Sequence, residues 1–181
     1  AEAAKTTAAL QQVLPGYQVD PKDERTAGEV RYWVGQKDDG TKAYAFLASK
    51  PGYSSEVLSM VGMDESGTIL GVSVLSQQET PGLGTRIQEV PSAVSFWQFI
   101  TGQIPEDSGP HKAWFAEQFE GLKADQIKLV KGTEWLNMSE QEKKQLLEQN
   151  AISALSGATI TSRAVSESIE ETAKKLLKAV K

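Results

Sequence analysis

The sequence contains no cysteine and a single histidine, His111. Without cysteine, the chain cannot form disulfides, thiolate nucleophiles or most structural zinc sites. A Ser-His-Asp triad would have to use His111, and no G-x-S-x-G sequence supports one. A metal site made of several histidines is excluded, and the acidic residues lack the spacing of a calcium-binding loop. We therefore expect no hydrolytic triad, thiol chemistry or resident metal.

Positive charge and long apolar runs are also scarce. The formal net charge is -5 and the isoelectric point is near 5.0. Because no basic stripe is present to neutralise phosphates, nucleic-acid binding is excluded. No apolar run approaches the roughly 20 residues of a membrane-spanning helix. The 181 residues, 39% of them hydrophobic, predict one domain. Since Ala1 is not methionine and no signal peptide follows it, we expect a mature protein or an excised fragment.

Four runs rich in valine, isoleucine and aromatic residues predict β-strands. They are RYWVGQ (31–36), KAYAFLAS (42–49), SSEVLSMVGMD (54–64) and TILGVSVLS (68–76). Turn sequences separate them, and Asp38-Asp39-Gly40 and Glu65-Ser66-Gly67 are typical of tight hairpin loops. The spacing therefore predicts an antiparallel β meander.

Helical patterns flank this meander. A short, frayed lead-in helix is predicted before Pro15-Gly16, two aromatic-bearing helices at 91–102 and 111–122, and a polar helix at 139–150, while 126–132 predicts a strand. The clearest helix runs from about Ile160 to Val180. Its apolar stripe comprises Ile160, Ala164, Val165, Ile169, Ala173, Leu176, Leu177 and Val180. The fold class is therefore α+β, a single domain with a meander packed against helices and a long amphipathic C-terminal helix.

The sequence LSGATITSRAV places Ser156–Ser162 at the start of this last helix. Backbone N–H groups at a helix N-terminus lack intrahelical partners, and the helix dipole adds positive charge, so phosphate binds there readily. Gly157 permits a tight turn, and small Ala158 leaves the place open. Hydroxyls that can donate to phosphate oxygens belong to Ser156, Thr159, Thr161 and Ser162. By itself, this short motif favours a simpler interpretation, in which Ser156 or Thr159 caps the helix.

A second stretch, QETPGLGTRI, has the composition of an irregular loop. Pro81, Gly82 and Gly84 leave main-chain amides free to face a ligand. Its side chains offer an apolar contact, a carboxylate and a hydroxyl, from Leu83, Glu79 and Thr80. In isolation, a surface loop that joins a strand to a helix is the better interpretation. Together, the two stretches could hold a phosphate on one side and a flat, polar-edged ring on the other.

The order of these elements resembles the FMN-binding domain of bacterial respiratory complexes. SGATITS precedes an amphipathic helix, and ETPGLG follows a strand meander. The family includes RnfG of the Rnf electron-transport complex, the type that we favour from the ETPGLG loop and compact length, and NqrC of the sodium-pumping quinone reductase, the alternative. The resemblance implies that residues 41–181 form the FMN-binding domain. It also implies that residues 1–40 are a lead-in segment after a membrane anchor outside this chain.

The resemblance further implies an electron-transfer flavoprotein domain of a membrane-bound, ion-translocating oxidoreductase. We expect it on the periplasmic or extracellular side of the cytoplasmic membrane, with other subunits of the complex as partners. A separate flavin transferase would join FMN, taken from FAD, through its phosphate to Thr159. The implied phosphate turn comprises Ser156, Gly157 and Ala158, with Thr161 and Ser162 as neighbours. The implied ring side comprises Glu79, Thr80, Gly82 and Leu83, and the Glu79 charge would disfavour a negatively charged reduced flavin.

One position departs from the family pattern. The transferase pattern places aspartate three residues before the S/T-G-A-T tetrapeptide, and this chain has Ser153 there. The departure keeps two alternatives open. One is an FMN-binding-domain protein without attached flavin that acts as a sensor or structural module. The other is a domain that binds another phosphorylated ligand without a covalent bond.

Overall fold

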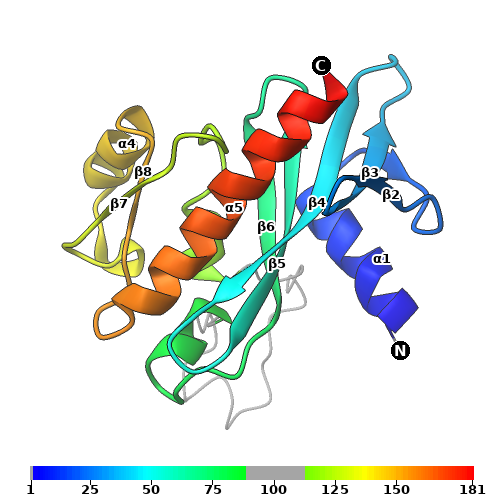
Figure 1. The fold of residues 1–181 in the computed structure, drawn as a ribbon. Coiled ribbons are helices and arrows are strands. Elements are labelled where there is room, and N and C mark those ends of the chain that lie inside the picture. Colours follow the sequence, from blue (N-terminus) through cyan, green and yellow to red (C-terminus); the bar gives the residue numbers. More distant parts are fainter. Residues whose placement is uncertain (1, 89–112) are drawn as a thin grey trace, which may run out of the picture.

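An antiparallel sheet lies at the centre of the computed structural model, which describes residues 2–88 and 113–181 (Figure 1). Its long strands pair in sequence order and are β3 (Val30–Gln36), β4 (Lys42–Pro51), β5 (Glu56–Asp64) and β6 (Ile69–Ser76). The short strands β1 (Gln18–Val19) and β2 (Arg25–Ala27) both pair with β3. Each long strand overlaps one predicted run, so the antiparallel meander is confirmed.

The turns of the meander also follow the sequence. Gly40 and Gly67 have φ angles of 87° and 86°, which glycine adopts without steric cost, at the two predicted hairpin loops. The predicted boundary at residue 40 lies in the first of these loops. Because β3 pairs with β4 across it, residues 30–36 belong to the same sheet as the strands that follow.

Helix α1 (Glu2–Val13) packs on one face of the sheet and is not the frayed segment expected from its sequence (Figure 1). Leu10 and Val13 are 2% and 0% exposed. A Cβ at Gly62 would lie 1.9 Å from the Val13 carbonyl oxygen, and one at Gly71 would lie 2.9 Å from the Val13 Cα. The two glycines let the helix approach β5 and β6 closely, and the resulting burial orders it.

Helix α5 (Thr159–Val180) crosses the opposite face of the sheet (Figure 1). The members of the predicted stripe that are fully buried are Val165, Ile169, Ala173 and Leu176. Ile160, predicted as the first member, is instead 52% exposed, because the first turn of the helix extends beyond the core and borders a cavity. The α+β class and the long C-terminal helix are confirmed.

Short elements connect the sheet to α5. They are η1 (Gly84–Gln88), α3 (Trp114–Glu117), β7 (Lys128–Val130), η2 (Trp135–Asn137), α4 (Glu140–Glu148) and β8 (Ala151–Ser153). The predicted strand at 126–132 and the polar helix at 139–150 are confirmed as β7 and α4. The helix predicted at 111–122 is reduced to four residues, and both the one predicted at 91–102 and His111 lie outside the described residues.

Strand β8 leads directly into the S-G-A-T turn. Helix α4, which precedes β8, has a defined start and a defined end. Ser139 and Glu142 form a reciprocal capping box that begins α4. Asn150 ends it with a φ of 54°. The Asn150 side chain accepts a hydrogen bond from Lys123 N–H at 2.7 Å and donates to the Gln126 carbonyl at 3.0 Å. The chain therefore enters β8, parallel to β7, from a defined point.

Candidate cofactor site

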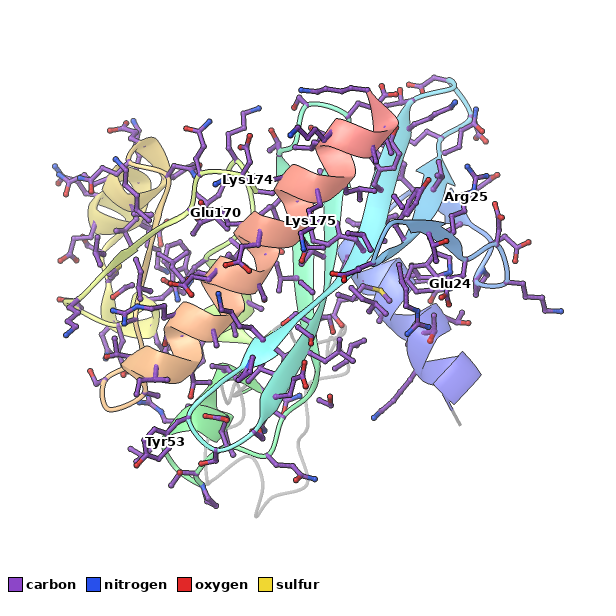
Figure 2. The ribbon with its side chains drawn as sticks, in the orientation of Figure 1. Glu24, Arg25, Tyr53, Glu170, Lys174 and Lys175 are labelled. Carbon is purple, nitrogen blue, oxygen red and sulfur yellow. The ribbon has the colours of Figure 1, made fainter. Side chains whose placement is uncertain are left out.

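A cavity of about 650 Å³ lies where α5 begins. Three segments line it, namely the β4–β5 turn, the ETPGLG loop and the start of α5. The lining residues are Tyr53, Glu79, Thr80, Leu83, Gly84, Gly157, Ala158, Thr159, Ile160 and Thr161. Figure 2 shows Tyr53 on the β4–β5 turn, at the end of the sheet where α5 starts. The structure thus brings the two predicted stretches together around a space of the size that binds small cofactors.

The start of α5 carries no capping side chain. The residue before the first helical residue, Thr159, is Ala158, and no side chain among the described residues bonds to the first-turn amides as a cap. The interpretation of Ser156 or Thr159 as a helix cap is therefore wrong. Gly157 has a φ of 75°, and a Cβ there would lie 3.1 Å from Leu83 Cδ2. The turn leaves the amide groups of the first helical turn available beside the cavity.

The hydroxyls near this turn are not equivalent. Thr161 is 1% exposed and donates to the Glu79 carboxylate. Ser162 Oγ donates to the Ala158 carbonyl at 2.8 Å and accepts from Leu155 N–H at 3.0 Å. Thr159 is half-buried, and its hydroxyl makes no hydrogen bond to another described residue. Thr159 lines the cavity with an uncommitted hydroxyl, whereas Thr161 and Ser162 hold the protein's own structure.

Glu79 joins the three segments that line the cavity. It is 4% exposed, and its carboxylate accepts hydrogen bonds from the N–H groups of Tyr53, Ser54 and Ser55 at 3.0, 3.1 and 2.9 Å. The Ser55 hydroxyl, at 3.1 Å, and the Thr161 hydroxyl also donate to it. Burial raises the pKa of Glu79, but the Thr161 hydroxyl and the three amides lower it further, so its pKa lies below the ordinary value. The buried carboxylate is ionised and fixes the ETPGLG loop against the β4–β5 turn and α5.

A second carboxylate, Glu134, holds the other end of the turn. Its oxygens accept from Arg86 Nη1 and Nη2 at 2.9 and 2.8 Å, and Oε1 also accepts from Ser156 N–H at 3.0 Å. The Arg86 guanidinium lowers the pKa of Glu134, burial raises it and the Ser156 amide lowers it, with a net shift below the ordinary value. Sequence patterns could not reveal this contact, because Glu134 belongs to no motif and lies 22 residues before Ser156.

Ser153, the position that departs from the family pattern, is fully buried beneath the turn. Its hydroxyl donates to the Thr133 carbonyl at 2.8 Å, and its N–H donates to Gln118 Oε1 at 2.8 Å. Gln118 returns a hydrogen bond to the Ser153 carbonyl at 3.3 Å. Serine at this position is therefore a satisfied donor that ties β8 to the residue before Glu134.

Two lining residues, Tyr53 and Ile160, were not predicted to contact a ligand, whereas Gly84 lies in the loop that was. Tyr53 and Ile160 are 72% and 52% exposed, and Gly84 is buried. Exposed apolar side chains could not be recognised without the fold, because Ile160 fits the helical stripe and Tyr53 lies in an ordinary turn sequence. Gly82 and Ser156 do not line the cavity, although both belong to the segments that do. Across residues 2–88 and 113–181, no cluster of acidic or histidine side chains could hold a metal ion.

Sequence comparison decides the family. The sequence profile of the FMN-binding domain family matches residues 52–174, which include both the ETPGLG loop and the S-G-A-T turn. The chain belongs to the FMN-binding domain family. This assignment agrees with a cavity of cofactor size between those two segments.

Two similar proteins are G subunits of ion-translocating oxidoreductase complexes. The chain is 34% identical over 111 residues to the G subunit of the ion-translocating oxidoreductase complex of Haemophilus influenzae, covering 60% of this chain and 51% of the relative. It is 33% identical over 150 residues to the G subunit from Pasteurella multocida, covering 81% of this chain and 57% of the relative. The chain thus spans about half the length of the curated relatives that it matches.

Solved structures share the fold. The crystal structure of the C subunit of the Na(+)-translocating NADH-quinone reductase from Parabacteroides distasonis matches with a TM-score of 0.55 and 21% identity, covering 83% of this chain and 62% of that one. NqrC of Shewanella oneidensis matches with a TM-score of 0.54 and 19% identity, covering 94% and 74%. Within the described ranges, no helix of this FMN-binding domain has the length and apolar character needed to cross a membrane.

Proposed function

We propose that this chain is an electron-transfer domain that carries FMN bound covalently through its phosphate to Thr159. The observation that carries the proposal is the uncommitted hydroxyl of Thr159, at an uncapped helix N-terminus, beside a cavity of about 650 Å³. Bound FMN would supply reversible electron transfer, so the protein needs no acid or base of its own. This agrees with the lack of catalytic motifs in the sequence.

The residues around Thr159 fit a phosphodiester. A phosphate on the Thr159 oxygen would lie beside the first-turn amides and the positive end of the dipole of the 22-residue α5. Gly157, with its positive φ, turns the chain so that Ser156 and Ala158 flank this place. A covalent bond would keep the cofactor in place through repeated oxidation and reduction.

The ring would lie between apolar side chains at the cavity mouth. Leu83, Tyr53 and Ile160 are each more than 40% exposed and line the same cavity, and exposed apolar side chains that gather around one cavity are typical of a binding site. Thr80 adds a hydroxyl to this side. Glu79 would act mainly by holding the loop, since its carboxylate already accepts three amide hydrogen bonds. We therefore expect its charge to affect the flavin less than an unpaired carboxylate would.

Attachment would follow a balanced phosphoryl transfer from FAD. The Thr159 oxygen forms a bond to the phosphorus on the FMN side, the pyrophosphate P–O bond breaks, and AMP leaves with the electron pair. The hydroxyl proton goes to the flavin transferase or to solvent. No group of this chain needs to act as the base, which agrees with the lack of a base bonded to the Thr159 hydroxyl among the described residues.

The wider assignment follows the relatives. Since these are G subunits of ion-translocating oxidoreductase complexes, we propose that the domain passes electrons between other subunits of such a complex. Its place on the periplasmic or extracellular side of the cytoplasmic membrane, with residues 1–40 leading in from a membrane anchor, belongs to the same proposal. The exposed mouth of the cavity supports the proposed electron transfer, because a partner subunit must approach the edge of the flavin ring.

Co-expression with a flavin transferase tests the proposal. We expect yellow protein whose visible absorbance stays with the chain after denaturation, and whose mass rises by one FMN less one water. Thr159→Val should remain colourless after denaturation, whereas Ser156→Ala should still be modified. A colourless wild-type chain, made beside a substrate domain that is modified, would contradict covalent attachment. Phosphate-ligand binding without colour would then favour the non-covalent alternative.

A further inference from the structure

The S-G-A-T turn is held from outside its own motif, by a carboxylate that no sequence pattern assigns. Resting on the proposed function above, we propose that Glu134 is a positioning residue for flavin attachment. It would fix the start of the turn so that the Thr159 hydroxyl faces the transferase in one conformation. Ser153 and Arg86 would keep the Glu134 side chain in place.

The contacts of Glu134 carry the first step. Its side chain is 12% exposed, and one oxygen, Oε1, accepts both Arg86 Nη1 at 2.9 Å and Ser156 N–H at 3.0 Å. The other oxygen accepts Arg86 Nη2 at 2.8 Å. A two-point contact with guanidinium fixes the plane and orientation of the carboxylate. The amide of Ser156 is therefore bonded to an acceptor that cannot easily rotate away.

The path of the turn carries the second step. Ser156 begins the tetrapeptide that ends at Thr159. Between them, Gly157 has a φ of 75°, in the left-handed region, and reverses the path of the backbone. The end of the turn is fixed by Ser162 Oγ, which bonds to Ala158 and Leu155. Holding Ser156 fixes the other end. With both ends held, the Thr159 hydroxyl has few alternative positions.

The buried serine beneath the turn carries the third step. The Ser153 hydroxyl donates to the carbonyl of Thr133, the residue immediately before Glu134, at 2.8 Å. Ser153 and Glu134 therefore form a matched pair, in which the serine positions the backbone and the glutamate supplies the carboxylate.

The experiment compares rates of FMN incorporation by intact mass, with FAD and a limiting amount of flavin transferase. Glu134→Ala should be modified about tenfold more slowly, because an ordered hydroxyl reacts far more readily than a mobile one. The rate for Glu134→Gln should lie between those of the wild type and Glu134→Ala. Its amide oxygen still accepts from Ser156 N–H, while the ion pair with Arg86 is lost.

The matched control is Glu170→Gln, which removes an ion pair of 2.7 Å with Lys174 on the outer face of α5, away from the turn (Figure 2). It should be modified at the wild-type rate. A second readout is amide hydrogen exchange of Ser156 in protein without flavin. Exchange should be slow in the wild type and in Glu170→Gln, and at least several-fold faster in Glu134→Ala.

Two results would overturn the inference. One is modification of Glu134→Ala at the wild-type rate, and the other is slow modification with unchanged exchange at Ser156. If Glu134→Ala does not fold, the modification rate and the Ser156 exchange of Glu134→Gln are compared with the wild type instead. If the wild type takes no flavin while a known substrate domain does, the proposed function fails instead. Exchange at Ser156 then still decides whether Glu134 holds the turn.

Discussion

Glu79 and Glu134 both hold the start of α5 in place, but they do so by different chemistry. Glu79 contacts Thr161 in the first turn of the helix, and Glu134 contacts Ser156 before it. Glu79 is satisfied by three backbone amides and by the hydroxyls of Ser55 and Thr161, with no cation among these donors. Glu134 is satisfied mainly by the Arg86 guanidinium, with the Ser156 amide as an additional donor. Both have a pKa below the ordinary value, so both are anions at neutral pH.

The difference concerns what each carboxylate leaves behind when it is removed. Loss of Glu79 would remove the acceptor of the buried Thr161 hydroxyl and of the part-buried amides of Tyr53, Ser54 and Ser55 at the same time. Loss of Glu134 would remove one acceptor of the Arg86 guanidinium, whose side chain is 26% exposed and can be hydrated. Glu79 should therefore matter most for stability, and Glu134 for the geometry of the attachment turn.

The largest expected effect is from Glu79→Ala. Three amides and the hydroxyls of Ser55 and Thr161 would lose this acceptor, so we expect a loss of about 3 kcal/mol in the free energy of unfolding. Urea unfolding followed by fluorescence measures it. Glu79→Gln, which keeps one carbonyl oxygen, should lose clearly less. Equal and small losses in both variants would contradict the role given to the Glu79 network.

A similar but smaller effect is expected from filling the space beside Glu79. A Cβ at Gly84 would lie 2.5 Å from Glu79 Cβ and 2.9 Å from Thr161 Oγ1, so Gly84→Ala should cost about 2 kcal/mol by urea unfolding. Gly82→Ala is the control in the same loop. Its Cβ would meet nothing within 4 Å, and it should cost about 1 kcal/mol through its φ of 74° alone. A reversed order would show that the loop packs differently.

Glu134→Ala should cost about 1 to 2 kcal/mol in unfolding free energy, less than Glu79→Ala, because Arg86 remains partly hydrated. The same urea measurement gives the comparison. Arg86→Met, which removes the cation and leaves the Glu134 carboxylate without its guanidinium partner, should cost at least as much. If Glu134→Ala proved more destabilising than Glu79→Ala, the ranking of the two networks would be wrong.

The smallest expected effect is in the response to acid. Because the folded-state pKa values of both carboxylates lie below the unfolded value of about 4.3, their contribution to stability is present above that pH. It is lost as the pH falls through the folded-state values. Melting temperatures between pH 6 and pH 3 should therefore fall less steeply in Glu79→Gln and Glu134→Gln than in the wild type. Parallel curves for all three proteins would rule out this linkage.

The two carboxylates also mark what could be predicted from the sequence. Glu79 lies in the ETPGLG stretch, and Thr159 ends a motif, so local patterns pointed to both. The contact of Glu134 with Ser156 depends on β7, α4 and β8 bringing distant segments together, and no local pattern contains that information. Ile160 was misplaced for a related reason, since helical spacing predicts a stripe but not where the core beneath it ends.

The same limit applies to the fold. The alternation of apolar and polar residues with turn sequences was enough to predict the four long strands and α5. The packing of α1 was not predicted, because it depends on Gly62 and Gly71, which leave room on the sheet face for the backbone of Val13. The two-residue β1 and three-residue β8 are too short for any periodicity and are defined by their partners.

Peptide mapping of protein co-expressed with a flavin transferase tests the central claim most directly. Cleavage after Lys144 and Arg163 releases residues 145–163, which contain Thr159 together with Ser153, Ser156, Thr161 and Ser162. Fragmentation of this peptide should place one FMN, less one water, on Thr159 and on no other hydroxyl. An unmodified peptide from a preparation in which a known substrate domain is flavinylated, or flavin on a different residue, would contradict the account.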